Sequence, residues 1–426
     1  MKRRFTVQEA LDHILAENDA EDTPSVTDEP VSEEDDAIEY ESEYTDSSDE
    51  EGTGAEAAPV TETYKSKKGN ITWSAIPPVS HGREAAENVM KMTPGITRFA
   101  LTRVSDIKTC FDLFMPLSLK KVIIALTNLE GKKVHGDTWK DIDEECLDAF
   151  IGVLLLAGVY RSSNEALTSL WDVSTGRSIF CATMSLQTFQ MISRVLRFDN
   201  RDTRARSDKL APIKDVWDRW VKLLPLMFNP GQEVTVDERL LPFRGKCPFW
   251  QYMPSKPGKY GIKIWAACDA KTSYAWNLQI YTGKLAAGIP EKNQGKRVIL
   301  DMTTGLRGHN ITCDNFFTSN DLGQELLKRK LTMVGTIRKN KPELPLEILQ
   351  VKDRAPLSSK FAFTETTSVV SYCPKKNRSV VLMSTLHKDA AVSTRSDKKP
   401  EIILDYNKNK GGVDTLDKLT ATYTCQ

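Results

Sequence analysis

The spacing of the apolar residues changes along the chain and divides it into regions. Between about residues 88 and 232 the apolar positions recur at helical spacing, as in Leu186 to Phe198, where they line one face. In residues 141–159, acids precede a long apolar run, which is typical of a helix N-terminus. Another helix is predicted from Val216 to Met227, ended by Pro230. The pattern therefore predicts an all-helical block.

From residue 233 the pattern alternates, as expected for strands with one buried face. Helical and extended segments follow each other from there to about residue 340. The predicted strands are 233–243, 261–269, 273–283, 309–314 and 331–338, and the predicted helices are 295–304 and 319–329. Three antiparallel strands followed by helix, strand, helix and strand is the order of an α/β core of RNase H type, a mixed sheet with flanking helices.

The two ends of the chain have weaker patterns. Residues 341–400 are irregular, with β-hairpin patterns, and a last helix opens at Gly411. Residues 1–20 carry a short amphipathic pattern, and the segment after them is acidic and poor in apolar residues. Such a segment buries too little apolar surface to offset the entropy cost of ordering. We therefore expect residues 1–87 to form a disordered acidic tail.

Charge is segregated, although the formal net charge of the 426 residues is zero. Residues 1–60 contain 20 acids and 3 bases, whereas the rest of the chain contains 38 acids and 55 bases. An acidic tail on a basic body favours a polyanionic partner such as nucleic acid. A solvated, lysine-rich surface and a merely solubilising tail are the alternatives.

The remaining composition excludes several classes of protein. The eight cysteines and five histidines are scattered without metal-ligand spacing, so no zinc is expected. The longest apolar stretch, residues 149–160, is about half of a membrane span, and no signal peptide is recognisable. We expect an intracellular protein without a membrane segment.

Three acids lie at positions suited to chemistry. Asp237 lies inside an apolar strand, Asp314 ends another strand, and Asp414 opens a helix. A carboxylate among apolar residues is costly to bury unless it is paired or binds a cation. Carboxylates that converge from several elements suit Mg²⁺, and two such metals can cleave a phosphodiester. The alternative is that each Asp caps a turn or helix, and these residues alone leave both interpretations open.

The order of several motifs resembles the piggyBac transposase family over roughly residues 88–424. The motifs are Val-Thr-Val-Asp-Glu (234–238), Phe-Arg-Gly (243–245), Lys-Tyr-Gly-Ile-Lys (259–263), Thr-Cys-Asp-Asn-Phe-Phe-Thr-Ser (312–319), Val-Gly-Thr-Ile-Arg-Lys-Asn-Lys (334–341) and Tyr-Asn-Lys-Asn-Lys-Gly-Gly-Val-Asp-Thr-Leu-Asp (406–417). The resemblance implies a core of three aspartates that cleaves DNA at terminal inverted repeats with Mg²⁺ or Mn²⁺. It also implies insertion at TTAA, a homodimer and a nuclear location, to which Lys65-Ser-Lys-Lys adds a weak import signal.

Carried over by motif, Asp237, Asp314 and Asp414 become the catalytic metal ligands. Asp417, three residues further along the helix of Asp414, becomes a supporting catalytic carboxylate. Arg338 and Lys341 would contact DNA phosphate, although a solvated loop is the alternative for both.

The resemblance also implies a domain division. Its parts are a helical dimerisation and DNA-binding domain (88–232), a catalytic core (233–340), an insertion domain (341–400) and the end of the core with the third aspartate (401–426).

The family pattern continues past the end of this chain. Further helices and a cysteine-rich zinc module follow in the family, whereas this chain ends at Gln426. We therefore expect the helical domain to be incomplete and the last segment of the core to be truncated. The alternative function is a domesticated, catalytically inactive DNA- or chromatin-binding protein, and a non-functional fragment is a third reading.

Overall fold

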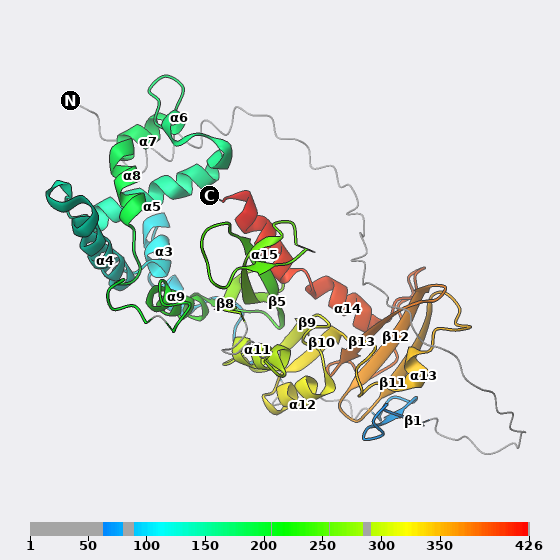
Figure 1. The fold of residues 1–426 in the computed structure, drawn as a ribbon. Coiled ribbons are helices and arrows are strands. Elements are labelled where there is room, and N and C mark those ends of the chain that lie inside the picture. The colour runs from blue at the N-terminus through cyan, green and yellow to red at the C-terminus, as the bar shows by residue number, and fades with distance from the viewer. Residues whose placement is uncertain (1–62, 80–88, 206, 255, 284–290, 425–426) are drawn as a thin grey trace, which may run out of the picture.

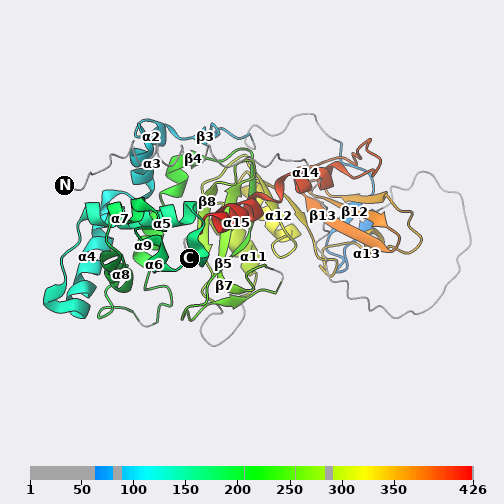
Figure 2. The same cartoon turned by 90° about the horizontal axis from the view of Figure 1, so that it is seen from above.

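The computed structural model describes residues 63–79, 89–205, 207–254, 256–283 and 291–424. Helices gather at one end of the molecule, a sheet crosses the middle, and more strands extend it at the other end (Figure 1). The view from above shows the same succession (Figure 2). Within the described ranges, no helix has both the length and the apolar character that a membrane crossing would require.

The helical block is built from short and medium helices around an aromatic core. Asp143 caps the helix that follows it, because its Oδ1 accepts a hydrogen bond of 2.8 Å from the Cys146 N–H. Phe150, Phe180 and Val195 are buried in its core. The helices are α2 (Arg98–Leu101), α3 (Ile107–Phe114), α4 (Leu117–His135), α5 (Glu144–Val159), α6 (Leu167–Leu170), α7 (Ser178–Thr183), α8 (Leu186–Val195), α9 (Lys214–Val221) and α10 (Leu224–Met227).

The single helix predicted from Val216 to Met227 is wrong. The structure has two helices there, α9 and α10, and Pro225 stands in the first turn of α10. Proline lacks the N–H that would continue a helix, and its ring clashes with the preceding turn. The short strands β3 (Gly95–Ile96) and β4 (Phe228–Asn229) pair beside this break.

The central sheet confirms the strand and helix order expected from the alternating pattern. Its strands are arranged β8–β7–β5–β9–β10, antiparallel from β8 to β5 and parallel from β5 to β10. A short strand, β6, pairs with the start of β7. The bounds are β5 (Glu233–Pro242), β6 (Gln251–Tyr252), β7 (Tyr260–Asp269), β8 (Ala275–Ile280), β9 (Asn310–Cys313) and β10 (Thr332–Thr336), with α11 (Gln294–Met302) and α12 (Asn320–Lys328) as the flanking helices.

One face of this sheet forms the main core. Val236 of β5, Ile311 of β9 and Met333 of β10 are fully buried in it, together with Val298 of α11 and Leu322 of α12. The central strands are buried because the helices cover them, which is the usual condition of parallel strands. This packing holds the ends of β5 and β9 in register.

The β-hairpin patterns expected in residues 341–400 are confirmed, but the expectation that the segment is otherwise irregular is wrong. These residues continue the central sheet, because β13 pairs antiparallel with β10 and β12 and β11 follow in order. The pairing with β10 buries residues such as Val370 and Leu382. The bounds are α13 (Leu346–Leu349), β11 (Ser358–Phe363), β12 (Ser368–Lys375) and β13 (Arg378–Ser384).

The expected disordered tail is wrong for residues 63–79. There β1 (Thr63–Lys65) and β2 (Thr72–Ser74) form a hairpin, and β2 joins the edge of β11. Trp73 is fully buried, and its Nε1–H donates to the Glu343 carbonyl at 3.0 Å. One buried tryptophan on an existing sheet edge offsets the ordering of a short hairpin. Residues 1–62, with the predicted amphipathic segment, and residues 80–88 lie outside the described residues.

The last two helices return the chain to the central sheet. Helix α14 (Glu401–Asn409) lies beside β10 and β13, and α15 (Gly412–Thr422) packs on β5 and β7. In Figure 1 both helices, in red, run from the strand-rich end back across the middle of the molecule. The C-terminal segment thereby reaches the strand that carries Asp237.

Candidate functional site

Asp237 and Asp314 lie side by side where the parallel pairing of β5 with β9 ends, with Asp237 in the middle of β5 and Asp314 directly after β9. They are called the strand-end pair below. Val236 of β5 is opposite Cys313 of β9, and each aspartate directly follows its member of this pair. Neighbouring strands are about 4.8 Å apart, so the two carboxylates leave the sheet next to each other. The predicted positions, Asp237 inside a strand and Asp314 at the end of another, are confirmed. The tertiary structure adds that the two residues lie side by side.

Burial and like charge both act on this pair. Burial, followed by the nearby charges of Asp314 and Glu238, raises the pKa of Asp237 to about 7. Burial and the charge of Glu238 also raise the pKa of Asp314 above its ordinary value. Both shifts mean that the ionised forms are disfavoured, which is the condition that a bound cation relieves.

Local hydrogen bonds hold the two aspartates in place. The Phe316 N–H donates to Asp314 Oδ1 at 2.9 Å, and the Thr318 hydroxyl donates to the Asp314 carbonyl at 2.8 Å. The Glu238 N–H donates to Asp237 Oδ1 at 2.7 Å. One oxygen of each carboxylate is thus occupied by a backbone donor, and the remaining lone pairs are available to a ligand.

Glu238 was not singled out from the sequence, although it stands in the same motif as Asp237. Its Oε2 lies 3.1 Å from the Nζ of Lys263 in an ion pair on β5 and β7. The ammonium of Lys263 also lies 4.0 Å from the centre of the Trp265 ring. Glu238 therefore contributes negative charge to the site while its own carboxylate is partnered.

Asp414 lies near this pair but does not join it. Helix α15 begins against β5, where a Cβ at Gly412 would stand 2.8 Å from the Thr235 hydroxyl, so glycine permits the close approach. The Asp414 side chain is 59% exposed, and its Oδ1 lies 3.7 Å from the Nζ of Lys256. Lys256, in the loop between β6 and β7, was missed because no sequence pattern marks it.

Asp417 faces β5 from the next turn of α15. Its Oδ1 lies 2.9 Å from the Nε of Arg239, which is almost fully buried and also donates to the Thr420 hydroxyl at 2.8 Å. Burial raises the pKa of Asp417, and Arg239 opposes that shift. In this structure Asp417 anchors α15 to the strand of Asp237, so its place is that of a positioning residue.

The donor set fits a hard cation only in part. Asp237 and Asp314 supply adjacent carboxylate oxygens of the kind that Mg²⁺ and Mn²⁺ prefer. Within the described part of the chain, however, no group of three or more His, Cys, Asp or Glu residues is placed to hold a metal ion. The expected third ligand, Asp414, is engaged by Lys256 instead.

Arg338 and Lys341 lie in the loop that follows β10. Arg338 is exposed, and its Nε donates to the Asn315 side chain at 3.1 Å, beside the turn of Asp314. The Lys341 N–H donates to the Arg338 carbonyl at 3.1 Å, which closes the loop into a turn. The structure thus brings Arg338 to the rim of the carboxylate pair, with Lys341 in the same loop.

Tyr406 of α14 is a further neighbour that the sequence did not reveal. Burial raises its pKa, and the negative charges of Asp314 and Asp237 act in the same direction. The phenol already shares a hydrogen bond with the Thr336 side chain, so it lines the site as a partnered polar group near both carboxylates. Only the return of α14 to the sheet places it there.

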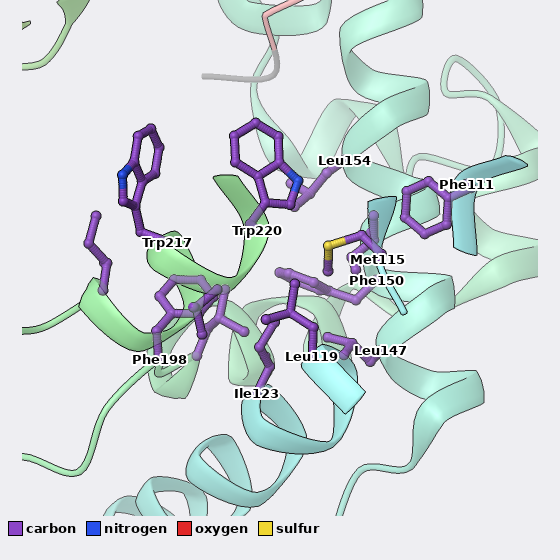
Figure 3. Close-up of a pocket in the computed structure, with 14 residues that line it drawn as sticks. Phe111, Met115, Leu119, Ile123, Leu147, Phe150, Leu154, Phe198, Trp217 and Trp220 are labelled. Atoms are coloured by element: carbon purple, nitrogen blue, oxygen red, sulfur yellow. The ribbon is translucent and has the colours of Figure 1, made fainter. Parts of the chain in front are cut away.

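An apolar cavity of about 480 Å³ lies apart from this chemistry, in the helical block. Phe150, Trp217 and Trp220 are among the side chains that surround it (Figure 3). All of its lining residues are apolar, so it offers no acid, base or metal ligand. The carboxylates at the strand ends therefore remain the candidate site.

Comparisons with known proteins show which family the chain resembles. A family model described as "Transposase IS4" matches residues 106–426. The human "PiggyBac transposable element-derived protein 3" is 25% identical over 343 residues, covering 72% of this chain and 54% of that protein. The human "Chimeric ERCC6-PGBD3 protein" is equally similar over 72% of this chain and 30% of its own length. The chain thus spans about half the length, or less, of these curated relatives.

A solved structure is similar in fold and in sequence. It is the cryo-EM structure of a piggyBac transposase synaptic complex with hairpin DNA, with a TM-score of 0.73 and 34% sequence identity. The match covers 79% of this chain and 72% of that chain. The family match spans most of the chain, including both strand-end aspartates, and the chain therefore belongs to the family of piggyBac-type transposases.

Proposed function

We propose that this chain cleaves and joins DNA strands as a transposase, with Asp237 and Asp314 as the centre of its active site. One observation carries the proposal, namely that these two carboxylates lie side by side where the parallel pairing of β5 with β9 ends, with a raised pKa on each. Groups with pKa values shifted by burial and like charge are concentrated at functional sites. A purely structural pair of acids would be expected to have a cationic partner at closer range.

The strand order supports a catalytic core of RNase H type. Three antiparallel strands, β8, β7 and β5, continue into the parallel strands β9 and β10, with α11 and α12 packed against them. This arrangement places Asp237, in the middle of β5, beside the point where β9 ends at the edge of the parallel part of the sheet. Carboxylates on that edge are the part of the core that a phosphodiester would reach.

Mg²⁺ or Mn²⁺ is the cofactor of this proposal, held by Asp237 and Asp314, and it would supply positive charge to the attacking and leaving oxygens of the phosphodiester. We propose Asp414 as the third ligand. Its carboxylate would have to leave Lys256 and turn toward Asp237 and Asp314 to bind the metal. Lys256 also acts on Asp237 through its charge, so the two aspartates share this lysine as a neighbour. Asp417 keeps α15 in place through Arg239.

The substrate in this proposal is double-stranded DNA. The solved relative is a complex with hairpin DNA, and residues 61–426 of this chain carry 55 bases against 38 acids, which suits a polyanion. Arg338 and Lys341 would bind phosphate beside Asp314. Cleavage at terminal inverted repeats, insertion at TTAA, a homodimer and a nuclear location complete the proposal by family likeness, and zinc is not part of it.

Nicking of a hairpin or inverted-repeat DNA by the purified protein tests the proposal. Wild type should nick in the presence of Mg²⁺ or Mn²⁺, whereas Asp237→Asn and Asp314→Asn should not. Asp353→Asn is a matched control, because Asp353 is exposed and its backbone has a φ of 63°, which asparagine tolerates. Equal nicking by wild type and by the two site variants would reject the catalytic role.

A second function is favoured by the position of Asp414. Its exposure, its contact with Lys256, and the absence of a three-residue metal cluster among the described residues fit a domesticated, catalytically inactive DNA- or chromatin-binding protein. In that case the protein would bind DNA in a salt-dependent manner, and no divalent cation would elicit nicking. The same assay therefore separates the two functions.

A further inference from the structure

Three exposed aromatic rings gather on the hairpin that contains β6 and β7. Trp250, Tyr252 and Tyr260 are 48%, 55% and 45% exposed. The ring of Tyr260 is 5.4 Å from that of Trp250 and 4.8 Å from that of Tyr252, measured between centroids. Single exposed aromatics are common on protein surfaces, but these rings touch one another and are tilted by 56° and 37°, so they form a contiguous aromatic patch in which each ring has its own face.

The chain around these rings has one sign of charge. Residues 240–268 contain no aspartate or glutamate. They contain five bases, which are Arg244, Lys246, Lys256, Lys259 and Lys263. Lys263 pairs with Glu238, and Lys256 lies near Asp414. The other three basic residues lie in the hairpin or in the segment that precedes it. Aromatic rings interleaved with basic side chains complement a nucleic acid strand, because the rings can stack on nucleobases and the basic side chains can neutralise phosphates.

The rings lie on the face of the sheet that carries Asp237. Tyr252 is opposite Tyr260 in the pairing of β6 with β7. Along β7, Tyr260 points to the same side as Ala266, which is opposite Asp237 on β5. Six residues of strand separate the rings from that point, which is about 20 Å at about 3.3 Å per residue. That distance is about six nucleotides at the spacing of one duplex strand.

The loop of the hairpin links the rings to the carboxylates. It folds back so that Lys256 approaches Asp414, and the Met253 N–H donates to the Lys259 carbonyl at 2.7 Å to close it. Within the described part of the chain, no strand pairs with the outer side of β6. Helix α15 covers Ile264 and Ala266 of β7 on this face, so a DNA strand bound at Asp237 and Asp314 would pass the hairpin loop beside Lys256 to reach the three rings.

We propose that Trp250, Tyr252 and Tyr260 form a stacking surface for unpaired bases of the DNA strand that enters the carboxylate site. This inference rests on the proposed function, because it takes DNA as the substrate. Every base has a π-face, so the surface selects unpaired over paired DNA rather than one sequence over another. The lysines of the hairpin neutralise the phosphates between the stacked bases.

Binding measured without catalysis tests this inference. Fluorescence anisotropy in EDTA would compare a hairpin DNA that has an unpaired loop with a fully paired duplex of the same length. Trp250→Ala/Tyr252→Ala should weaken hairpin binding by roughly tenfold or more, and duplex binding by less than about threefold. Trp250→Phe/Tyr252→Phe keeps both rings and should bind like wild type.

Phe99→Ala is the matched control, because Phe99 is a 39% exposed aromatic on α2, with Arg103 3.9 Å above its ring. It should leave both affinities unchanged. Thermal unfolding of each variant shows that the fold is retained. Equal weakening on both DNAs, no weakening on either, or equal weakening by the Phe variant would each overturn the inference. Metal-dependent nicking with no effect of the rings rejects this inference alone, whereas ring-dependent binding without any nicking rejects the catalytic function alone.

Discussion

Two pairs of aspartates lie in or beside strand β5, and their electrostatic settings differ. Asp237, in the middle of β5, and Asp314, directly after β9, stand next to each other, and burial raises the pKa of both carboxyl groups. Asp414 and Asp417 stand one turn apart on α15, where Lys256 and Arg239 lie 3.7 Å and 2.9 Å from their carboxylates. The first pair lacks a cation at such close range, and the second pair has one for each acid.

This difference indicates which acids the fold leaves unsatisfied. A carboxylate next to an ammonium or guanidinium group has part of its charge compensated by the protein itself. Two neighbouring carboxylates at a buried strand end have a cost that only a proton or a metal ion removes. The strand-end pair is therefore the fixed part of the proposed metal site, and α15 supplies the part that must rearrange.

The largest effect is expected for Asp414→Asn in the nicking assay. If Asp414 exchanges Lys256 for the metal site, the variant should lose activity by on the order of 10³-fold, as expected for Asp237→Asn. The rate of nicking in Mg²⁺ and in Mn²⁺ measures this. Retained activity in Asp414→Asn would show that two carboxylates suffice and that Asp414 stays with Lys256.

The pH dependence of stability should separate the two pairs in the opposite way. The pKa of Asp237 is raised from 3.8 to about 7, so its ionisation costs stability progressively as the pH rises from about 4 to 7. Asp237→Asn removes this cost, so at pH 8 in EDTA its free energy of unfolding should exceed that of wild type by at most about 4 kcal/mol.

The advantage of Asp237→Asn should vanish below about pH 4, where Asp237 is protonated in both the folded and the unfolded state. Urea unfolding from pH 4 to 8 measures the difference. Asp414→Asn should show no such gain, because Asp414 is mostly exposed. A variant Asp237→Asn that is less stable than wild type at pH 8 would contradict the burial of an unsatisfied charge.

Metal binding should raise the stability of the folded protein through the strand-end pair. At a Mg²⁺ or Mn²⁺ concentration 100 times the Kd, the gain for wild type is about 2.7 kcal/mol. Melting temperatures with and without metal measure it. Asp237→Asn and Asp314→Asn should gain much less, whereas Asp353→Asn should behave as wild type does. An equal gain in all four proteins would place the metal elsewhere.

The smallest effect concerns Arg338, beside the Asp314 turn, and Lys256, beside Asp414. Arg338 is exposed beside the Asp314 turn, so Arg338→Gln should weaken duplex binding severalfold and lower the salt dependence by about one phosphate contact. Lys256→Gln should change that dependence less, because Asp414 already neutralises part of the charge of Lys256. Affinities measured at several salt concentrations decide this, and equal slopes for the two variants would remove the distinction.

Much of the fold followed from local patterns. The alternation around Asp237 and Asp314 identified β5 and β9 correctly, because strands buried by helices have a clear apolar signature. The helix capped by Asp143 was recognisable from its acids. The break before α10 was missed because the apolar pattern continues from α9 to Pro225, whereas α9 ends at Val221 and Pro225 lies in the first turn of a new helix.

The errors at the strand-rich end have one physical cause. Residues 63–79 and 341–400 have weak patterns. Their strands extend the central sheet on the side of β10, where β13 pairs with β10 and β2 pairs with β11. Trp73 is buried there only because β11 and the Glu343 carbonyl are already in place. The hairpin of β1 and β2 at the sheet edge, and β11 to β13 inside the sheet, gain stability from pairing with neighbouring strands, and that information is not local.

The sequence by itself determined the family, the strands that carry Asp237 and Asp314, and the helix that carries Asp414. It could do so because motifs and apolar periods are written in consecutive residues. Only the tertiary structure decided that Asp237 and Asp314 lie side by side, that Lys256 contacts Asp414, and that Trp250, Tyr252 and Tyr260 form one patch. These relations join residues far apart in the chain, and they depend on register, burial and loop return, which no local pattern specifies.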